Sequence, residues 1–347
     1  MSTMTRDPMV SVMIPCLNEE GYIAGCLDSI LASDYPKDRL EILVADGRSS
    51  DRTREIVAPY VTRHASVTLL DNPAGTTPAA LNVAVRAASG DVIIRMDAHV
   101  TYPPEYIRRL VRGLEESGAD NVGGVLETVP AEDTAVARAI AIGMSHRFGV
   151  GNSHFRVGST KAREVDTVAF GCFRRDVFVR AGLFDEELIR NQDDEFNFRL
   201  ISRGGRVLLL PEVSCRYFAR RSLAHLSRMY YQYGYFKPLV ARKVGRIMTV
   251  RQLIPALLLT LLLGTAGLSL WIPAAGSVFL LVLSLYVSLV VVAALTSLRS
   301  NGIRCALALA AVFPVLHFSY GAGFLVGIRD HLLLRGVTRT GVLGLSR

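Results

Sequence analysis

Two carboxylates and a histidine stand directly after apolar segments, where the ends of strands would place them. Asp46 follows the run Leu40–Ala45, and Asp97 follows Val92–Met96, with His99 two positions later. Alternate residues of a strand point to the same side, so Asp97 and His99 can face one site. One carboxylate and one imidazole leave coordination positions open for phosphate oxygens and water, which suits Mg²⁺ or Mn²⁺. Both are candidate metal ligands, although a strand-end aspartate also commonly caps the next helix.

A second acidic group precedes the helical run Phe196–Leu200. It reads Gln-Asp-Asp-Glu over residues 192–195. A carboxylate placed beside a substrate hydroxyl can remove its proton as that hydroxyl attacks. Asp193 is the candidate base, and a solvated helix start is enough to explain at least one of Asp194 and Glu195.

Asp46 and Glu19 are candidates for holding a nucleotide. A carboxylate at the mouth of a cleft can accept a hydrogen bond from an N–H group of a nucleobase, which is the role expected of Asp46. Glu19, one turn past the first apolar run, could contact the base or the ribose. Its neighbour Glu20 is explained by the favourable interaction of an acid with a helix N-terminus.

The elements that must position these residues alternate between strands and helices. The apolar runs predict four strands, at Val10–Pro15, Leu40–Ala45, Val67–Leu70 and Val92–Met96. Helical spacing between them predicts helices over Glu19–Leu31, Arg52–Val61 and Thr77–Ala88. Such alternation is typical of an α/β domain with a mostly parallel sheet and helices on both faces. Ligands of these sheets bind beyond the carboxyl ends of the strands, where all the candidates lie.

Several function classes do not fit this pattern. Residues 15–20 after the first strand contain no glycine, so the dinucleotide fingerprint of nicotinamide and flavin enzymes is absent. A phosphate loop of the Walker type is also absent. The five cysteines are scattered without metal-ligand spacing, which fits a reducing compartment and small apolar side chains in a core.

The last third of the 347-residue chain has the composition of a membrane domain. No charged residue occurs in Leu253–Leu298, which can hold two spans of about 20 residues with a turn near Trp271–Pro273. Cys305–Ile328 can hold a third. A transporter is excluded because His317 is the one acidic or basic pathway residue in these segments.

The formal net charge of +8 is explained by the membrane rather than by nucleic acid. Basic residues cluster in Arg216–Arg228 and Lys237–Arg251, just before the first span, where anionic lipid of the cytoplasmic face attracts them. Met1–Met9 lacks the apolar region of a signal peptide, so the polar part should remain in the cytoplasm at the inner membrane. Three crossings would put the basic tail 329–347 outside, and a re-entrant third segment would avoid this.

Six motifs, in order and spacing, resemble glycosyltransferase family 2. They span roughly Val10 to Arg206 and comprise Ile14–Glu20, Asp46–Thr53, Gly75–Asn82, Asp97–His99, Gly171–Arg175 and Asp193–Glu195. Within the family, Asp-Ala-His is typical of the branch that contains bacterial succinoglycan-synthesis transferases. The resemblance implies a GT-A fold, a nucleotide-diphospho-sugar donor, inversion at the anomeric carbon and C-terminal membrane helices.

The resemblance also implies roles for individual residues. The nucleotide-sugar would contact Pro15, Leu17, Glu19, Asp46, Asn82 and Asp97. The metal, Mg²⁺ or Mn²⁺, would be held by Asp97 and His99, and Asp193 would be the base. The acceptor side would include Gly171, Cys172, Arg199 and Lys237. His99 departs from the usual second aspartate, which puts metal affinity in doubt, and Gln192 stands where relatives often have glutamate.

The resemblance favours one sugar transferred per encounter. The polymer-holding Gln-x-x-Arg-Trp motif of processive members is not matched by Gln232–Phe236, which lacks both Arg and Trp. The expected organisation is a cytoplasmic GT-A domain over 1–225, an interfacial basic segment over 226–251 and a membrane domain over 252–347. The donor expected from the family is a UDP-sugar, and the acceptor a lipid-linked saccharide or glycan in polysaccharide or glycolipid synthesis.

Two alternatives remain open from the sequence. A polyprenyl-phosphate sugar transferase would load one sugar onto a lipid phosphate, an acceptor that needs little help from a base such as Asp193. A membrane-tethered nucleotide-binding protein would have no activity to lose when Asp193 is changed. Nucleic acid is not an expected partner in either case.

Overall fold

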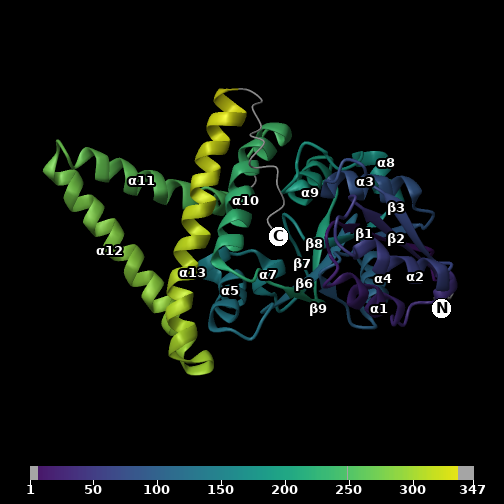
Figure 1. Cartoon of the computed structure of the whole chain (residues 1–347). Helices are drawn as coiled ribbons and strands as arrows, with labels where there is room; N and C mark the ends of the chain where they lie inside the picture. The colour runs from purple at the N-terminus through teal and green to yellow at the C-terminus, as the bar shows by residue number, and fades with distance from the viewer. Residues whose placement is uncertain (1–6, 248, 335–347) are drawn as a thin grey trace. The chain divides into compact units, whose positions relative to one another are not determined.

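The structure of the chain is a computed structural model that describes residues 7–247 and 249–334 (Figure 1). Two expectations from the sequence concern segments that lie partly outside these ranges. These segments are the short polar N-terminus, Met1–Met9, and the basic tail, residues 329–347. By its internal contacts the chain divides into two compact units. The first comprises Met1–Glu127 and Gly158–Tyr217, and the second comprises Thr128–Val157 and Phe218–Arg347. The sequence-based domain boundaries at 225 and 251 remain predictions.

The core of the first unit is a nine-stranded mixed sheet with the order β3-β2-β1-β4-β8-β6-β9-β5, to which β7 adds by pairing with β9. The strands are β1 (Val10–Cys16), β2 (Leu40–Asp46), β3 (Val67–Asp71), β4 (Val92–Arg95), β5 (Val100–Thr101), β6 (Asn121–Val129), β7 (Arg163–Glu164), β8 (Ala169–Arg174) and β9 (Val207–Phe218). The four strands predicted from apolar runs are all present and are parallel to one another. Of these, β1, β2 and β3 lie side by side in Figure 1.

The second half of the sheet is antiparallel. Strand β8 runs antiparallel to β4 and β6, and β9 runs antiparallel to β5 and β7. Strands β5 and β7 have two residues each, and the pairing of β6 with β8 is irregular, so the alternation of strands and helices described only the first half of the sheet.

Helices connect the strands of the first unit and pack against the sheet. They are α1 (Ile23–Leu31), α2 (Thr53–Arg63), α3 (Thr77–Ala87), α4 (Tyr106–Ser117), α8 (Arg175–Ala181) and α9 (Gln192–Ser202), with the 3₁₀ turn η1 (Lys37–Arg39). Helix α1 buries Ile23, Cys26, Leu27 and Ile30, which recur at the spacing of one helical face. Helix α3 packs on β1 and β2, and α4 packs on β8.

The second unit is helical. It contains α5 (Ala135–Ser145), α6 (Arg147–Val150), α7 (His154–Val157), α10 (Leu223–Val244), α11 (Ile254–Leu268), α12 (Pro273–Leu295) and α13 (Leu298–Gly327), with the 3₁₀ turn η2 (Val250–Gln252) and the π-helical turn η3 (Ile328–Leu333). Within the described residues, three helical segments are long and apolar enough to cross a membrane: Val250–Leu268, Pro273–Leu295 and Leu298–Leu333. The three hydrophobic helices and the turn near Trp271–Pro273 are confirmed.

Glycines let α10 and α13 pack with their backbones in close contact. A Cβ added at Gly323 of α13 would lie 2.0 Å from the carbonyl oxygen of Tyr231, and one at Gly327 would lie 2.2 Å from that of Tyr235. On α10, a Cβ at Gly234 would lie 2.0 Å from the carbonyl oxygen of Tyr320. Small residues at helix contacts permit this approach, and any side chain there must push the helices apart.

We therefore expect Gly323→Ala to destabilise the protein by about 1–3 kcal/mol through overpacking. The check is the midpoint of thermal unfolding of the purified protein in detergent. Gly264→Ala is the matched control, because a Cβ there meets nothing within 4 Å; it should leave the midpoint unchanged or raise it, since alanine favours a helix. Equal midpoints for both variants would contradict the close packing of α10 on α13.

Candidate active site

The candidate residues of the first unit gather beyond the carboxyl ends of the parallel strands. Cys16 of β1 pairs with Asp46 at the end of β2, and Met13 of β1 pairs with Arg95 at the end of β4. The segments that follow these strands therefore begin at one edge of the sheet. This is the edge at which ligands of open α/β sheets bind.

Arg95, which the sequence analysis did not single out, is central to this edge. It precedes Asp97 by two positions and forms a side-on pair with it, since Nε donates to Oδ1 over 2.9 Å and Nη2 donates to Oδ2 over 3.2 Å. Nη1 of Arg95 donates to both carboxylate oxygens of Asp193 in the first turn of α9. One buried guanidinium, only 6% exposed, thus joins the candidate metal ligand to the candidate base.

The charges of these groups depend on one another. Burial disfavours the Arg95 cation, but the negative charges of Asp193 and Asp97 outweigh that effect and raise its pKa. Burial raises the pKa of Asp193 above its usual range; Arg95 opposes the rise, and Asp97 adds to it. About a third of the Asp193 side chain (32%) remains exposed, against 14% for Asp97. Asp193 is therefore the more accessible carboxylate.

A bulge in β8 places an aromatic ring on Arg95. Val122 of β6 pairs with Cys172, whereas Gly124 pairs with Ala169, so β8 has one residue more than β6 between these pairs. Within this bulge Phe170 has a φ of +52°, an unusual conformation for a bulky residue. Its ring centroid lies 5.8 Å from Cζ of Arg95, within the range of a cation–π contact. Bulges near active sites often redirect a side chain in this way.

Two protonated groups hold the backbone of Asp97. The Cys26 thiol donates to its carbonyl oxygen over 3.6 Å, and the Tyr102 hydroxyl donates to the same oxygen over 3.2 Å. Burial raises the pKa of the Cys26 thiol and of the Tyr102 phenol well above their usual values, so both stay protonated. Cys26 therefore does more than fill space in the core, which was the role expected from the sequence.

His99 lies between two carboxylates. Its Nδ1 is 3.4 Å from Oε1 of Glu19, and its Nε2 is 4.0 Å from Oδ2 of Asp97. The edge of its ring contacts Tyr217, with the centroids 5.4 Å apart. The sequence-predicted residues Glu19, Asp97 and His99 are thus brought together.

The donor atoms of Asp97 and His99 fit a shared divalent cation. Ligands of Mg²⁺ lie about 2.0–2.1 Å from the ion, so two ligand atoms on one ion are at most about 4.2 Å apart. The 4.0 Å between Oδ2 and Nε2 is within that limit. The described residues contain no cluster of three or more His, Cys, Asp or Glu side chains suited to a metal. An ion bound here would take most of its ligands from substrate and water.

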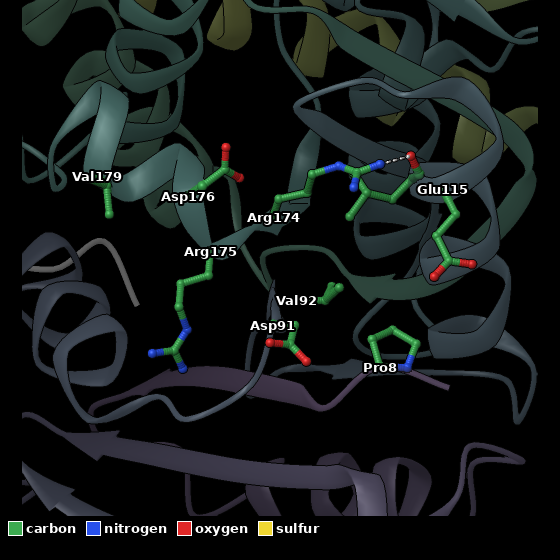
Figure 2. A pocket seen from close by; sticks show the side chains of 9 residues that line it. Pro8, Asp91, Val92, Glu115, Arg174, Arg175, Asp176 and Val179 are labelled. Atoms are coloured by element: carbon green, nitrogen blue, oxygen red, sulfur yellow. Dashed lines mark hydrogen bonds between the residues drawn. The ribbon is translucent and has the colours of Figure 1, made fainter. Parts of the chain in front are cut away.

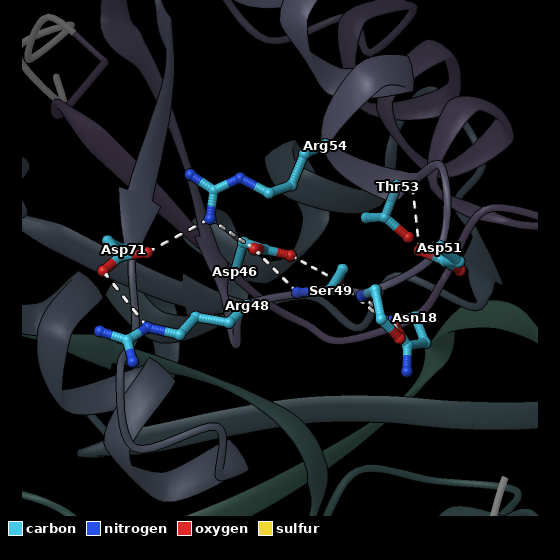
Figure 3. Close-up of polar contacts among 9 residues, drawn as sticks. Asn18, Asp46, Arg48, Ser49, Asp51, Thr53, Arg54 and Asp71 are labelled. Carbon is cyan, nitrogen blue, oxygen red and sulfur yellow. Dashed lines mark hydrogen bonds and ion pairs between the residues drawn. The ribbon is translucent and has the colours of Figure 1, made fainter.

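Asp46 is fully buried and surrounded by donors (Figure 3). Its Oδ1 accepts a hydrogen bond of 2.6 Å from the Ser49 hydroxyl, and its Oδ2 accepts one of 2.9 Å from Nη1 of Arg54. Arg54 also pairs with Asp71 at the end of β3, over 3.2 Å. Arg48 lies 4.0 Å from the other oxygen of Asp71. The solvent-facing side chains of this cluster are those of Arg48, Asp71 and Arg54, which are 65%, 54% and 44% exposed.

Hydrogen bonds join this cluster to the loop after β1. The backbone N–H of Asn18 donates to the Ser49 hydroxyl over 2.9 Å, and the backbone N–H of Glu19 donates to the Thr53 hydroxyl over 2.7 Å. Asp51 accepts from the backbone N–H of Thr53 over 2.9 Å, just before the start of α2. Pro15 lies within β1, and Leu17 follows it in this loop. The two loops therefore form one hydrogen-bonded surface.

Asn82 and Asn197 hold the segment that carries Asp193. The side-chain amide of Asn82 donates to the carbonyl oxygen of Phe184 and accepts from its backbone N–H, each over 2.9 Å. It also donates to the Glu186 carboxylate over 2.8 Å. Asn197 of α9 accepts from Asn121 over 2.7 Å and donates to Thr167 over 3.0 Å. Asn82 thus contacts the loop before α9 rather than an open cleft.

The residues expected on the acceptor side are used in different ways. Gly171 and Cys172 lie in β8, where a Cβ on Gly171 would be 2.4 Å from the Phe173 ring. Arg199 pairs with Glu195 over 2.7 Å and donates to the carbonyl oxygens of Ala181 and Leu183. Lys237 belongs to α10 of the second unit and is 9% exposed. Gly171, Cys172 and Arg199 thus belong to the first unit and Lys237 to the second, and their place on the acceptor side remains a prediction.

A cavity of about 500 Å³ lies away from these residues (Figure 2). Pro8 and Asp91, which line it, precede β1 and β4, so it is at the amino end of the parallel strands. Arg174 and Arg175 also line it, but they donate to the backbone carbonyls of Leu114, Gly90 and Ala88. These arginines hold the fold together at this edge.

Comparison with known proteins identifies the family. The profile described as "Glycosyl transferase family 2" matches residues 11–180. The succinoglycan biosynthesis protein ExoA of Rhizobium meliloti is 32% identical over 73% of this chain and 77% of its own. A dolichyl N-acetyl-α-D-glucosaminyl phosphate glucuronosyltransferase of Methanococcus voltae is 28% identical over 67% of this chain and 74% of its own.

Solved structures share the fold. The mannosyltransferase PcManGT of Pyrobaculum calidifontis, determined with GDP-Man and Mn²⁺, superposes with a TM-score of 0.62 at 20% identity, over 94% of this chain and 88% of its own. Residues 1–349 of S. aureus TarS with UDP-GlcNAc superpose with a TM-score of 0.51 at 18% identity, over 87% and 90% of the two chains. The chain belongs to glycosyltransferase family 2 and is a glycosyltransferase with the GT-A fold.

Proposed function

We propose that the chain transfers one sugar, with inversion, from a nucleotide-diphospho-sugar to a lipid-linked saccharide or glycan acceptor at a membrane. The observation that carries the proposal is the Asp97–Arg95–Asp193 arrangement at the carboxyl edge of the sheet. It puts the Asp97 carboxylate beside His99, the proposed second metal ligand, at one end and the partly exposed Asp193 carboxylate at the other. A single displacement at an anomeric carbon requires two things: a base for the attacking hydroxyl, and positive charge that stabilises the leaving group. Asp193 would be the base, and Asp97 and His99 would hold the ion that supplies the charge.

Asp193 acts as the base in this proposal. It removes the proton from the acceptor hydroxyl as that oxygen attacks the face opposite the leaving group. A Mg²⁺ or Mn²⁺ ion held by Asp97 and His99 would supply positive charge to the departing diphosphate. Glu19 lies 3.4 Å from His99 and orients its ring.

The surface formed by the loops after β1 and β2 holds the nucleotide. The first loop contacts the nucleotide through Pro15, Leu17 and Glu19. Asp46 acts indirectly, by holding Ser49 and Arg54 in place. Because Asp46 is fully buried under Ser49 and Arg54, contact with a base requires these side chains to move. Two structural neighbours were solved with GDP- and UDP-linked sugars, and a UDP-sugar is our proposal for this chain.

The three apolar helices and the lipid-linked acceptor in the name of one relative support a membrane acceptor. We propose a multi-pass protein of the inner membrane with its catalytic unit in the cytoplasm. The proposed acceptor-side residues remain Gly171, Cys172, Arg199 and Lys237. Arg199 would act indirectly, by holding the backbone carbonyls of Ala181 and Leu183 in place.

The function is tested by offering the full-length protein in detergent a panel of UDP-, GDP- and dTDP-sugars with Mg²⁺ or Mn²⁺ and a lipid extract. Release of nucleotide and transfer of label to lipid-linked material are expected from one donor. If no donor in the panel yields either product, the proposed function is wrong. Transfer onto a bare polyprenyl phosphate would instead favour the alternative acceptor.

Asp193→Asn should lower kcat about 10²- to 10⁴-fold, because it removes the base while keeping the shape of the side chain. The adjacent Asp194→Asn is the matched control and should keep kcat near the wild-type value. Steady-state transfer rates at saturating donor provide the measurement. Similar rates for Asp193→Asn and wild type would show that Asp193 is not the base.

Asp97→Asn and His99→Ala should each weaken Mn²⁺ binding in the presence of nucleoside diphosphate about 10-fold or more, since each removes one of two protein ligands. Electron paramagnetic resonance of free Mn²⁺ gives the affinity without relying on turnover. His64→Ala, at the end of α2, should leave the affinity unchanged. Treatment with a chelator should stop transfer, and added Mg²⁺ or Mn²⁺ should restore it.

The membrane assignment predicts how the protein fractionates. With three apolar helices, the chain should stay with the membrane pellet after alkaline carbonate extraction and dissolve in detergent. An engineered chain ending at residue 225 should not be retained in this way. Release of the full-length protein by carbonate would contradict insertion of its helices.

A further inference from the structure

We propose that Arg95 is a positioning residue that sets the separation and orientation of Asp97 and Asp193, and through Asp193 the rate of the chemical step. The inference rests on the proposed function, because it assigns Arg95 a task within that reaction. It adds a residue that contacts neither the reacting oxygen nor the sugar. It also explains why a charged residue occurs inside an otherwise apolar strand.

The contacts of Arg95 give each carboxylate one orientation. The side-on pair with Asp97 uses two N–H groups on two oxygens, a geometry that fixes both distance and rotation. The contact with Asp193 uses Nη1 on both oxygens, so that carboxylate also faces the guanidinium symmetrically. A lysine ammonium lacks the planar fork needed to make both contacts at once.

The charge of Arg95 makes the arrangement possible. With both carboxylates ionised, the three side chains carry one net negative charge in a largely buried place. Two carboxylates that share a buried site without a cation repel one another. The guanidinium therefore lets the two carboxylates lie close to each other.

The surroundings of Arg95 prevent it from moving. The Phe170 ring packs over the guanidinium from the bulge of β8, which is held in the left-handed conformation described above. Asp193 is fixed independently, because Asn197 ties α9 to Asn121 of β6 and to Thr167. Asn197 and Arg95 thus both tie α9 to the sheet, and Arg95 is the one of the two that contacts the candidate base.

Arg95→Lys tests the inference, with Arg180→Lys as the matched control. Arg180 also bridges two carboxylates, Asp120 and Asp176, but at the exposed end of α8. Arg95→Lys should lower kcat about 10²-fold, the effect of a small misplacement of catalytic groups, and change the donor KM less than about threefold. Mn²⁺ binding, measured without turnover, should weaken by less than in Asp97→Asn, because the Asp97 carboxylate is kept and only its orientation is lost. UDP binding should change less than about threefold. Arg180→Lys should keep wild-type kinetics.

A double-mutant cycle separates positioning from a structural role. If Arg95 acts through Asp193, Arg95→Lys should lower kcat by less than about twofold when Asp193 is already asparagine. If Arg95 has a merely structural role, Arg95→Lys should lower the kcat of Asp193→Asn by the same factor by which it lowers the kcat of the wild type. Equal factors in the two backgrounds, or wild-type kcat in Arg95→Lys, would overturn the inference.

Phe170→Leu provides a second variant in case Arg95→Lys does not fold. It keeps all three charges and removes only the aromatic cover, so kcat should fall about tenfold with an unchanged donor KM. Unchanged kcat in this variant would count against immobilisation of Arg95. The two possible failures can be told apart. If the proposed function is wrong, the wild-type protein is inactive. If only this inference is wrong, the wild-type protein is active and Arg95→Lys leaves its kcat unchanged.

Discussion

A guanidinium that is removed from water must be surrounded by negative charge, and in this chain Asp97 and Asp193 provide it. The need to satisfy Arg95 determines where the end of β4 and the start of α9 can lie. Buried ion pairs add little net stability, because desolvation offsets the attraction between the charges. A role in setting the geometry of the site accounts better for a buried arginine that joins Asp97, two positions away, to Asp193, 98 positions away.

The same principle operates around Asp46, at the end of β2. Asp46 is buried, and its oxygens accept hydrogen bonds from Ser49 and Arg54, while Ser49 in turn accepts from the Asn18 amide. A change at Asp46 would therefore loosen both loops at once. The buried acids of the site are thus satisfied by neighbouring side chains: Arg95 serves Asp97 and Asp193, and Ser49 and Arg54 serve Asp46.

Much of the parallel half of the fold was predictable, because its strands are buried on both faces and appear as uninterrupted apolar runs. The convergence of Glu19, Asp97 and His99 followed from the rule that parallel strands end at one edge. The three apolar helices followed from composition alone. The antiparallel half was not predictable in this way, since β5 and β7 are two residues each and β8 contains a bulge.

Arg95 was missed although the sequence contained a signal for it. An arginine in the buried run Val92–Met96 must find a negative partner, and Asp97 two positions on shares its side. Its second partner, Asp193, is 98 positions away, and no local pattern predicts that contact. Likewise, the motif position of Asn82 indicated importance but not its use in holding the loop before α9.

The central claim is that one base, Asp193, drives a single displacement at the anomeric carbon while the leaving group departs beside Asp97 and His99. The configuration of the product tests it most directly. Proton NMR of the transferred sugar, compared with the same sugar in the donor, reports whether the anomeric centre has changed. The account predicts inversion, so an α-linked donor yields a β-linked product. Retention of configuration would require two displacements and would contradict it.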